Sequence, residues 1–155
     1  MDFEDLVREH SGRIRQIARR FAATDAVDDL VQDIFTRLWR SYGSFRGDSK
    51  VESWIYRVAL NAAMTHLSGV VKSRTLHAAV SAHPAATAET PGSAGPADIL
   101  SHFLSQLSDV DASILMMYMD GLTGEEISGV LGISGNAINV RINRMKQKFS
   151  DAYVE

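Results

Sequence analysis

The sequence predicts an all-α fold made of two small helical domains joined by a flexible linker. Apolar residues recur at helical spacing through most of the first 67 residues, and the same spacing returns after residue 97. No alternating apolar pattern is long enough to make a convincing strand. Residues 78–97 hold all three prolines of the chain among small residues with one charge, which is typical of a linker. We therefore expect domains at 1–75 and 98–155, with the linker at 76–97.

The composition favours a protein that resides in a reducing compartment and does not catalyse a reaction. The chain has no cysteine, which excludes disulfides, thiol catalysis and cysteine-ligated zinc. No apolar run approaches the length of a membrane span, and the acidic N-terminus lacks signal-peptide character, so we expect a cytoplasmic protein without membrane insertion. The five histidines are scattered and no phosphate-cradling glycine loop is evident. We therefore expect no enzyme activity, no metal and no cofactor.

Three helices are expected in the first domain. Helical spacing runs from Phe3 to Phe21, and Thr24-Asp25 then marks a stop and a restart. A strongly amphipathic pattern follows over 27–39, in which we expect Phe35, Leu38 and Trp39 to belong to the core. After a loop with two glycines, Ser49 and Glu52 have the spacing of a capping box. They would open a helix whose apolar face includes a buried Trp54.

The second domain ends in a predicted helix-turn-helix, after helices near 97–107 and 109–119. Thr123 and Glu126 have capping-box spacing, Gly132 supplies a tight turn, and Ser134 can cap the helix that follows. That helix places an apolar stripe on one face and three cations on another. The stripe is Ile138, Ile142, Met145 and Phe149, and the cations are Arg141, Arg144 and Lys148.

The charge distribution supports a nucleic-acid role for this last helix. Residues 76–155 carry nine acidic residues and four cationic ones, and all four cations lie between Arg141 and Lys148. An acidic module with one basic helix fits a protein that needs a second anchor to bind DNA well. The alternative is a solvated helix whose cations merely complement the helix dipole.

Ordered motifs in both blocks resemble bacterial RNA polymerase sigma factors of the small extracytoplasmic-function group. The resemblance covers almost the whole chain apart from the linker. It rests on the order and spacing of these segments: Asp29–Phe35, Phe45–Ser49, Trp54–Asn61, Leu107-Ser108, Gly121–Thr123 and Glu126–Ser134.

This resemblance implies a two-domain adaptor with defined partners. The first domain, similar to sigma region 2, would bind the coiled coil on the largest subunit of core RNA polymerase and open the −10 promoter element. The second, similar to region 4, would bind the −35 element and the flap of the second large subunit. An anti-sigma factor that clamps both domains is the implied regulator.

The polymerase-binding residues implied by the resemblance lie on the 28–40 helix. They are Asp29, Gln32, Asp33, Arg37 and Arg40. Asp29 and Asp33 are one helical turn apart, so their carboxylates share a face and can pair with cations on a partner. The alternative is that the acids at the start of this helix only cap it and complement its dipole.

The −10 element is assigned to the glycine-containing loop and the helix after it. A melted base needs a pocket that offers stacking and hydrogen bonds to its edge. The candidates are Phe45, Arg46, Gly47, Asp48, Ser49, Lys50, Arg57 and Asn61. Asp48 has an alternative role as a helix cap. After Asn61 the usual dense cationic tract is reduced to Lys72 and Arg74, which predicts weaker −10 binding with a shallower salt dependence.

The −35 element is assigned to the last helix. Asparagine can pair bidentately with adenine and arginine with guanine, which favours Ser134, Asn136, Asn139 and Arg141 for base readout. Arg144 and Lys148 suit backbone phosphates.

Two rival functions remain open from the residues alone. The first is a helix-turn-helix regulator that binds duplex DNA without replacing sigma, and that would not need the Asp29–Asp33 helix. The second is an adaptor that mimics a sigma domain without binding DNA, which the intact basic helix disfavours.

Overall fold

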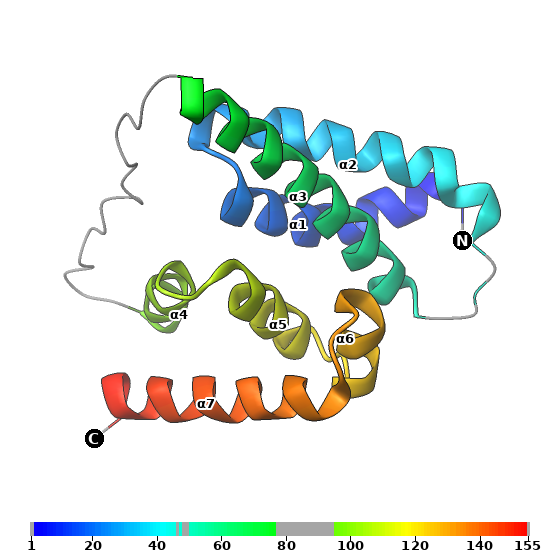
Figure 1. Cartoon of the computed structure of the whole chain (residues 1–155). Helices are drawn as coiled ribbons and strands as arrows, with labels where there is room; N and C mark the ends of the chain where they lie inside the picture. The colour runs from blue at the N-terminus through cyan, green and yellow to red at the C-terminus, as the bar shows by residue number, and fades with distance from the viewer. Residues whose placement is uncertain (1, 46, 48–49, 77–94, 155) are drawn as a thin grey trace. The chain divides into compact units, whose positions relative to one another are not determined.

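The computed structural model describes residues 2–45, 47, 50–76 and 95–154, and within these it contains helices and turns but no strand. The predicted all-α class is confirmed. The chain divides into two compact units, Met1–Ala79 and Val80–Glu155. Unit 1 contains α1 (Phe3–Phe21), α2 (Val27–Ser41) and α3 (Val51–Leu76), with short 3-10 turns η1 (Thr24–Ala26) and η2 (Tyr42–Ser44) (Figure 1). Unit 2 contains α4 (Pro96–Ser105), α5 (Asp109–Met119), α6 (Gly124–Leu131) and α7 (Gly135–Tyr153).

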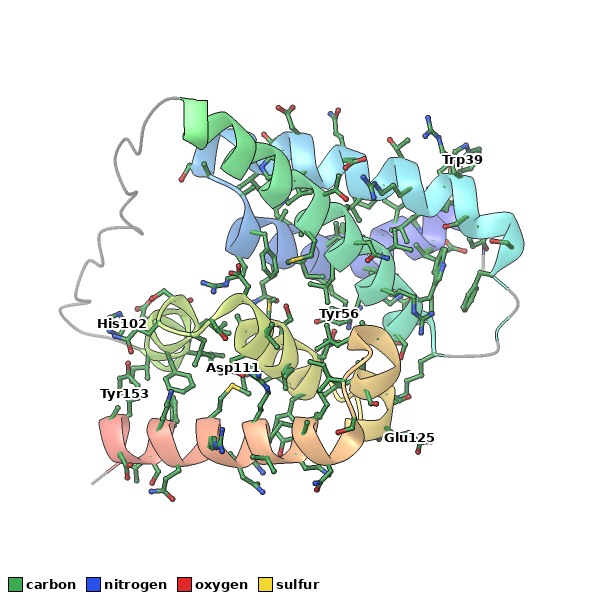
Figure 2. The ribbon with its side chains drawn as sticks, in the orientation of Figure 1. Trp39, Tyr56, His102, Asp111, Glu125 and Tyr153 are labelled. Atoms are coloured by element: carbon green, nitrogen blue, oxygen red, sulfur yellow. The ribbon has the colours of Figure 1, made fainter. Side chains whose placement is uncertain are left out.

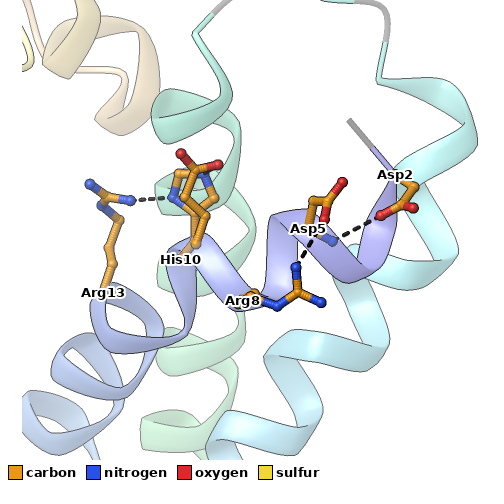
Figure 3. A network of polar contacts seen from close by, with 6 residues as sticks. Asp2, Asp5, Arg8, His10 and Arg13 are labelled. Atoms are coloured by element: carbon orange, nitrogen blue, oxygen red, sulfur yellow. Dashed lines mark hydrogen bonds and ion pairs between the residues drawn. The ribbon is translucent and has the colours of Figure 1, made fainter.

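Helix α1 begins at a side-chain cap. Asp2 accepts a hydrogen bond from the backbone N–H of Asp5 at 2.9 Å, which satisfies one of the free donors of the first turn. One turn later Arg8 pairs with the Asp5 carboxylate at 3.1 Å, and Arg13 contacts the ring of the buried His10 (Figure 3). Polar contacts between neighbouring turns thus stabilise the N-terminal half of this helix.

The core of unit 1 is formed where its three long helices pack against each other in pairs. Each helix contributes fully buried aliphatic side chains: Leu6, Ile14 and Ile17 from α1, Leu30, Ile34 and Leu38 from α2, and Ile55 from α3. Burial of one such side chain contributes about 1.5–3 kcal/mol of transfer free energy. On α3, Ala59, Ala62 and Ala63 are also fully buried, and their small side chains allow close approach.

The aromatic residues of unit 1 correct one expectation about the core. Trp54 is buried and Leu38 is fully buried, as predicted, and Phe35 is partly exposed. The prediction for Trp39 is wrong, because its side chain is 63% exposed. Trp39 is one residue beyond Leu38 and is therefore rotated by about 100° from the buried face. Its ring packs edge-on against Phe3, at 5.1 Å between centroids.

Unit 2 is held by contacts of α5 with α4, α6 and α7 and by the α6–α7 packing. Ser108 caps α5 through the N–H of Asp111. Ile138, Ile142 and Met145 are buried, which confirms the predicted stripe. Phe149 is partly exposed and packs edge-on against Phe103 at 5.3 Å, so it joins α7 to α4.

Candidate functional site

The predicted helix-turn-helix is present as α6, a turn at Gly132 and α7. Thr123 and Glu126 form the complete capping box: Glu126 N–H donates to Thr123 Oγ1, and Thr123 N–H donates to Glu126 Oε1. Gly132 ends α6 with φ of +73°, a left-handed conformation that favours glycine. Ser134 then caps α7 by accepting from the N–H of Ala137. Side chains within four positions of each other therefore fix where both helices begin.

Two of the four cations on α7 are engaged by α5. Arg141 Nη1 donates to Asp111 Oδ1 at 2.8 Å, and Asp111 lies on the side of α5 that faces α7 (Figure 2). The ammonium of Lys146 lies 5.0 Å from the centroid of the Tyr118 ring. Arg144 and Lys148 are exposed and make no ion pair within the described part of the chain. These two are the cations of α7 that are available to a phosphate.

The remaining −35 candidates lie around the N-terminal half of α7. Asn136 and Asn139 are both exposed. The Asn139 amide oxygen is 2.8 Å from the position that a Cβ at residue 124 would occupy, so Gly124 leaves room for this side chain. Ser134 is exposed, but its hydroxyl already serves as the cap. Of the four residues assigned to base readout, Asn136 and Asn139 are the two whose side chains make no hydrogen bond among the described residues.

Val140 and Asn143 are two exposed residues of α7 that the sequence motifs did not indicate. Val140 is 41% exposed although it is apolar, and Asn143 is also exposed. Val140 lies midway between Ile138 and Ile142, so it is about 200° from each around the helix and points away from the core. The signal was present in the helical spacing, because any residue opposite the buried stripe must face outward.

The polymerase-binding candidates share the outer surface of α2. Asp29, Gln32 and Arg40 are exposed, and Asp33 and Arg37 form an ion pair one turn apart at 3.1 Å. Asp29 makes no side-chain hydrogen bond or ion pair with a described residue, whereas Asp28 pairs with Arg15 of α1 at 2.9 Å. Among the described residues, no side chain makes a capping hydrogen bond at the start of α2. The exposed Trp39 projects from the C-terminal end of the same helix and was not predicted as a surface residue (Figure 2).

The −10 candidates fall partly on the loop before α3. Arg46, Asp48 and Ser49 lie outside the described residues. The Phe45 ring stacks on the buried Trp54 with centroids 4.7 Å apart and planes 22° apart. Gly47 has φ of +76°, a conformation that favours glycine. Lys50 is exposed just before α3, and its carbonyl accepts from the N–H of Trp54.

Arg57 and Asn61 are exposed one turn apart on α3, as their spacing predicts. Phe45 packs on the first turn of α3, and Arg57 and Asn61 follow on the same helix. Helix α3 can therefore present both a cation and an amide to a ligand.

The described residues indicate neither a metal centre nor a membrane span. Among the described residues, no three His, Cys, Asp or Glu side chains are grouped to hold a metal ion. None of the helices in the described part of the chain is long and apolar enough to cross a membrane.

The two helical units, one of them carrying a helix-turn-helix, define a class of DNA-binding transcription protein, and family models identify it further. The model of sigma-70 region 2 matches residues 6–70, and the model of sigma-70 region 4 matches residues 97–149. The chain belongs to the sigma-70 family, in the extracytoplasmic-function group, and is an alternative sigma factor of transcription initiation. The family is one of transcription regulators.

Curated relatives and solved structures agree with this family. The chain is 28% identical over 159 residues to the extracytoplasmic-function RNA polymerase sigma-E factors of Escherichia coli K12 and Salmonella typhimurium LT2, covering 94% of this chain and 83% of each relative. It shares its fold with the sigma factor RpoE of Bartonella quintana, solved with the anti-sigma factor NepR, at 18% identity and a TM-score of 0.81 over 97% of this chain and 95% of that one. CnrH, solved with the cytosolic domain of CnrY, matches at 24% identity and a TM-score of 0.64, over 96% and 85%.

Proposed function

We propose that the two units divide the work of this sigma factor between them. Residues 1–75 bind core RNA polymerase and the −10 element, residues 98–155 bind the −35 element, and 76–97 join the two domains. The observation that carries the proposal is the α6–Gly132–α7 helix-turn-helix, because its exposed α7 offers amides, a valine and two available cations on one element. A helix held in this way can enter a DNA major groove with its N-terminal residues against the bases.

The outer surface of α2 is the proposed contact for the polymerase coiled coil. Its exposed residues mix acids, an amide and cations, and at one end they include the large apolar Trp39. Tryptophan dominates many protein interfaces because a single ring buries a large apolar area. Asp29 supports the assignment further, since its carboxylate has no partner among the described residues and is available to a cation on the polymerase.

The loop before α3 is the proposed −10 site, together with Arg57 and Asn61. Phe45 is held against Trp54, so its role is to position the loop more than to meet DNA itself. Arg57 suits a backbone phosphate and Asn61 a base edge. Arg46, Gly47, Asp48, Ser49 and Lys50 complete the proposed site.

An anti-sigma factor is the proposed regulator. The sigma factor RpoE of Bartonella quintana, which shares this fold, was solved with the anti-sigma factor NepR, and CnrH was solved with the cytosolic domain of CnrY. The proposed polymerase and DNA surfaces are exposed within their own units, so a protein that covers either of them would silence this chain. We also propose that the chain acts in the cytoplasm, where its relatives meet the polymerase, and that RNA synthesis is left to the polymerase.

Reconstitution with core polymerase tests the proposed function. The purified chain is mixed with sigma-free bacterial core RNA polymerase, and the complex is isolated by gel filtration. It is then used in run-off transcription on pooled promoter fragments of the host. We expect co-elution and transcripts from a discrete set of start sites. Tight duplex binding by the chain alone, without a polymerase complex, would favour an independent regulator instead.

A double charge reversal tests the polymerase surface. Asp29→Arg with Asp33→Arg should abolish polymerase binding while the helical content measured by circular dichroism stays unchanged. The matched control is Glu4→Arg with Asp25→Arg, which makes the same charge change at two exposed acids of unit 1 that lie outside α2. Polymerase affinity that is equal in the two double variants would remove the assignment of α2.

A further inference from the structure

The outward face of α7 is neutral at its centre. Asn136, Val140 and Asn143 are spaced at i, i+4 and i+7, so they share one side of the helix, and all three are exposed. This side is opposite the buried Ile138 and Ile142. We call these three residues the neutral row.

The side chains of the neutral row keep polar and apolar groups open to solvent. Within the described residues, neither amide makes a side-chain hydrogen bond, and Val140 is 41% exposed. An exposed valine also has a lower helix propensity than alanine, so local stability does not explain Val140. A ligand that covers this row would contact side chains that remain exposed in the folded chain.

The cations of α7 border the neutral row and leave its centre uncharged. Arg141 is tied to Asp111 and Lys146 lies over Tyr118. Arg144 is one turn beyond Val140, and Lys148 follows one turn later, both exposed. Cations at one end of a neutral row suit a helix that holds phosphates with that end and meets base edges with its first turns.

We propose that the neutral row reads A·T base pairs of the −35 element, with Val140 against a thymine methyl group and Asn136 and Asn143 against adenine edges. This inference rests on the proposed −35 role of α7. In the major groove, thymine is the base that presents a methyl group, and an apolar side chain recognises it by contact. Adenine presents an adjacent acceptor and donor, which the amide of asparagine matches bidentately. Val140 and Asn143 thereby become specificity-determining residues for promoter choice.

The thymine methyl provides a test that changes one group at a time. The holoenzyme is bound to a promoter found by the run-off experiment, and each −35 thymine is replaced singly by deoxyuridine, which lacks only the methyl group. We expect one position at which the wild-type holoenzyme binds about four-fold more weakly, the effect of one apolar carbon losing its contact. Val140→Ala should bind the natural promoter about as weakly and show no further loss at that position.

The matched control is Val110→Ala. Val110 is a valine of α5 exposed to almost the same extent, 39%, and it lies outside the helix-turn-helix. Its variant should retain the full four-fold response to deoxyuridine. An equal response in Val140→Ala and in the wild type would overturn the inference, and so would a −35 element whose required positions contain no A·T pair.

The asparagines are tested in the same way with 7-deazaadenine, which removes the N7 acceptor of adenine. We expect about a five-fold loss for the wild type at one or two positions, and no response there for Asn136→Ala or Asn143→Ala. Unchanged wild-type binding at every −35 adenine would exclude the adenine contacts.

The outcomes separate this inference from the proposed function. A chain that forms no holoenzyme and starts no discrete transcripts fails as proposed above, and the inference fails with it. A chain that transcribes normally but ignores every deoxyuridine and 7-deazaadenine overturns the neutral-row readout alone.

Discussion

Arg141 of α7 donates a hydrogen bond to Asp111 of α5 at 2.8 Å, which joins two helices thirty residues apart in sequence. The arginine side chain is 41% exposed and the aspartate 21%, so the pair is accessible to solvent. A DNA phosphate and the Asp111 carboxylate would therefore compete for one guanidinium. In the folded chain this cation of α7 is paired with Asp111, and it would contact a phosphate only after that pair breaks.

Asp111→Asn should release Arg141. We expect promoter binding by the holoenzyme to tighten, and the salt dependence of log K to steepen by about one unit because one more phosphate contact forms. The stability cost should be about 1 kcal/mol or less, as for other exposed ion pairs. Binding titrations at several salt concentrations measure both effects. Asp98→Asn removes an exposed acid from α4 and is the charge-matched control, for which the slope should not change.

Gly132→Ala and Gly129→Ala should change stability in opposite directions. Neither glycine has an atom within 4 Å of the position of an added Cβ, so space does not distinguish them. Gly132 has φ of +73°, and alanine there costs about 1–2 kcal/mol. Gly129 is inside α6, where alanine gains about 0.5–1 kcal/mol. Urea unfolding followed by circular dichroism compares the two, and equal shifts would contradict the role of Gly132 in the turn.

Thr123→Ala should destabilise α6 by about 1 kcal/mol, because the Glu126 N–H loses its acceptor while the second bond of the capping box remains. Hydrogen exchange of the α6 amides measures this local loss. Thr65→Ala is the control, since its hydroxyl also bonds to backbone, at the Asn61 carbonyl, but inside a helix. Alanine is the better helix former there, so no loss is expected.

Trp39→Ala should separate binding from folding. The ring is largely exposed and packs edge-on against Phe3. The variant should therefore lose at most about 1 kcal/mol of its free energy of unfolding. Polymerase affinity should fall by ten-fold or more, the usual effect of losing an interface tryptophan. Leu38→Ala, one residue earlier and fully buried, should instead lose about 2–5 kcal/mol of stability. A Trp39→Ala variant with wild-type polymerase affinity would remove this residue from the interface.

Local signals account for most of what the sequence predicted correctly. The Thr123 capping box, the Gly132 turn and the Ser134 cap each depend on residues at most four positions apart. Short-range sequence spacing is therefore enough to predict them. The all-α class followed from helical spacing for the same reason. Family motifs then supplied the class of function, which spacing alone left open between three alternatives.

Packing between elements explains what the sequence did not predict. The exposure of Trp39 depends on where the face of α2 meets α1 and α3, which a single apolar stripe does not define within one residue. The Arg141–Asp111 pair joins side chains that are adjacent only after α5 and α7 pack. The exposure of Val140 is different, because helical spacing alone predicts it: this residue lies opposite the buried Ile138 and Ile142.

The stack of Phe45 on Trp54 has a consequence for genetics. Phe45 stacks on a buried ring, so its position depends on the packing beneath Trp54. If the residues after Phe45 contact the −10 element as proposed, substitutions in the interior of unit 1 would produce the same phenotype as substitutions at the proposed contacts. A selection for promoter-defective alleles should therefore recover interior positions beside Trp54 along with surface ones, and suppressors of the interior class should be alleles that restore packing.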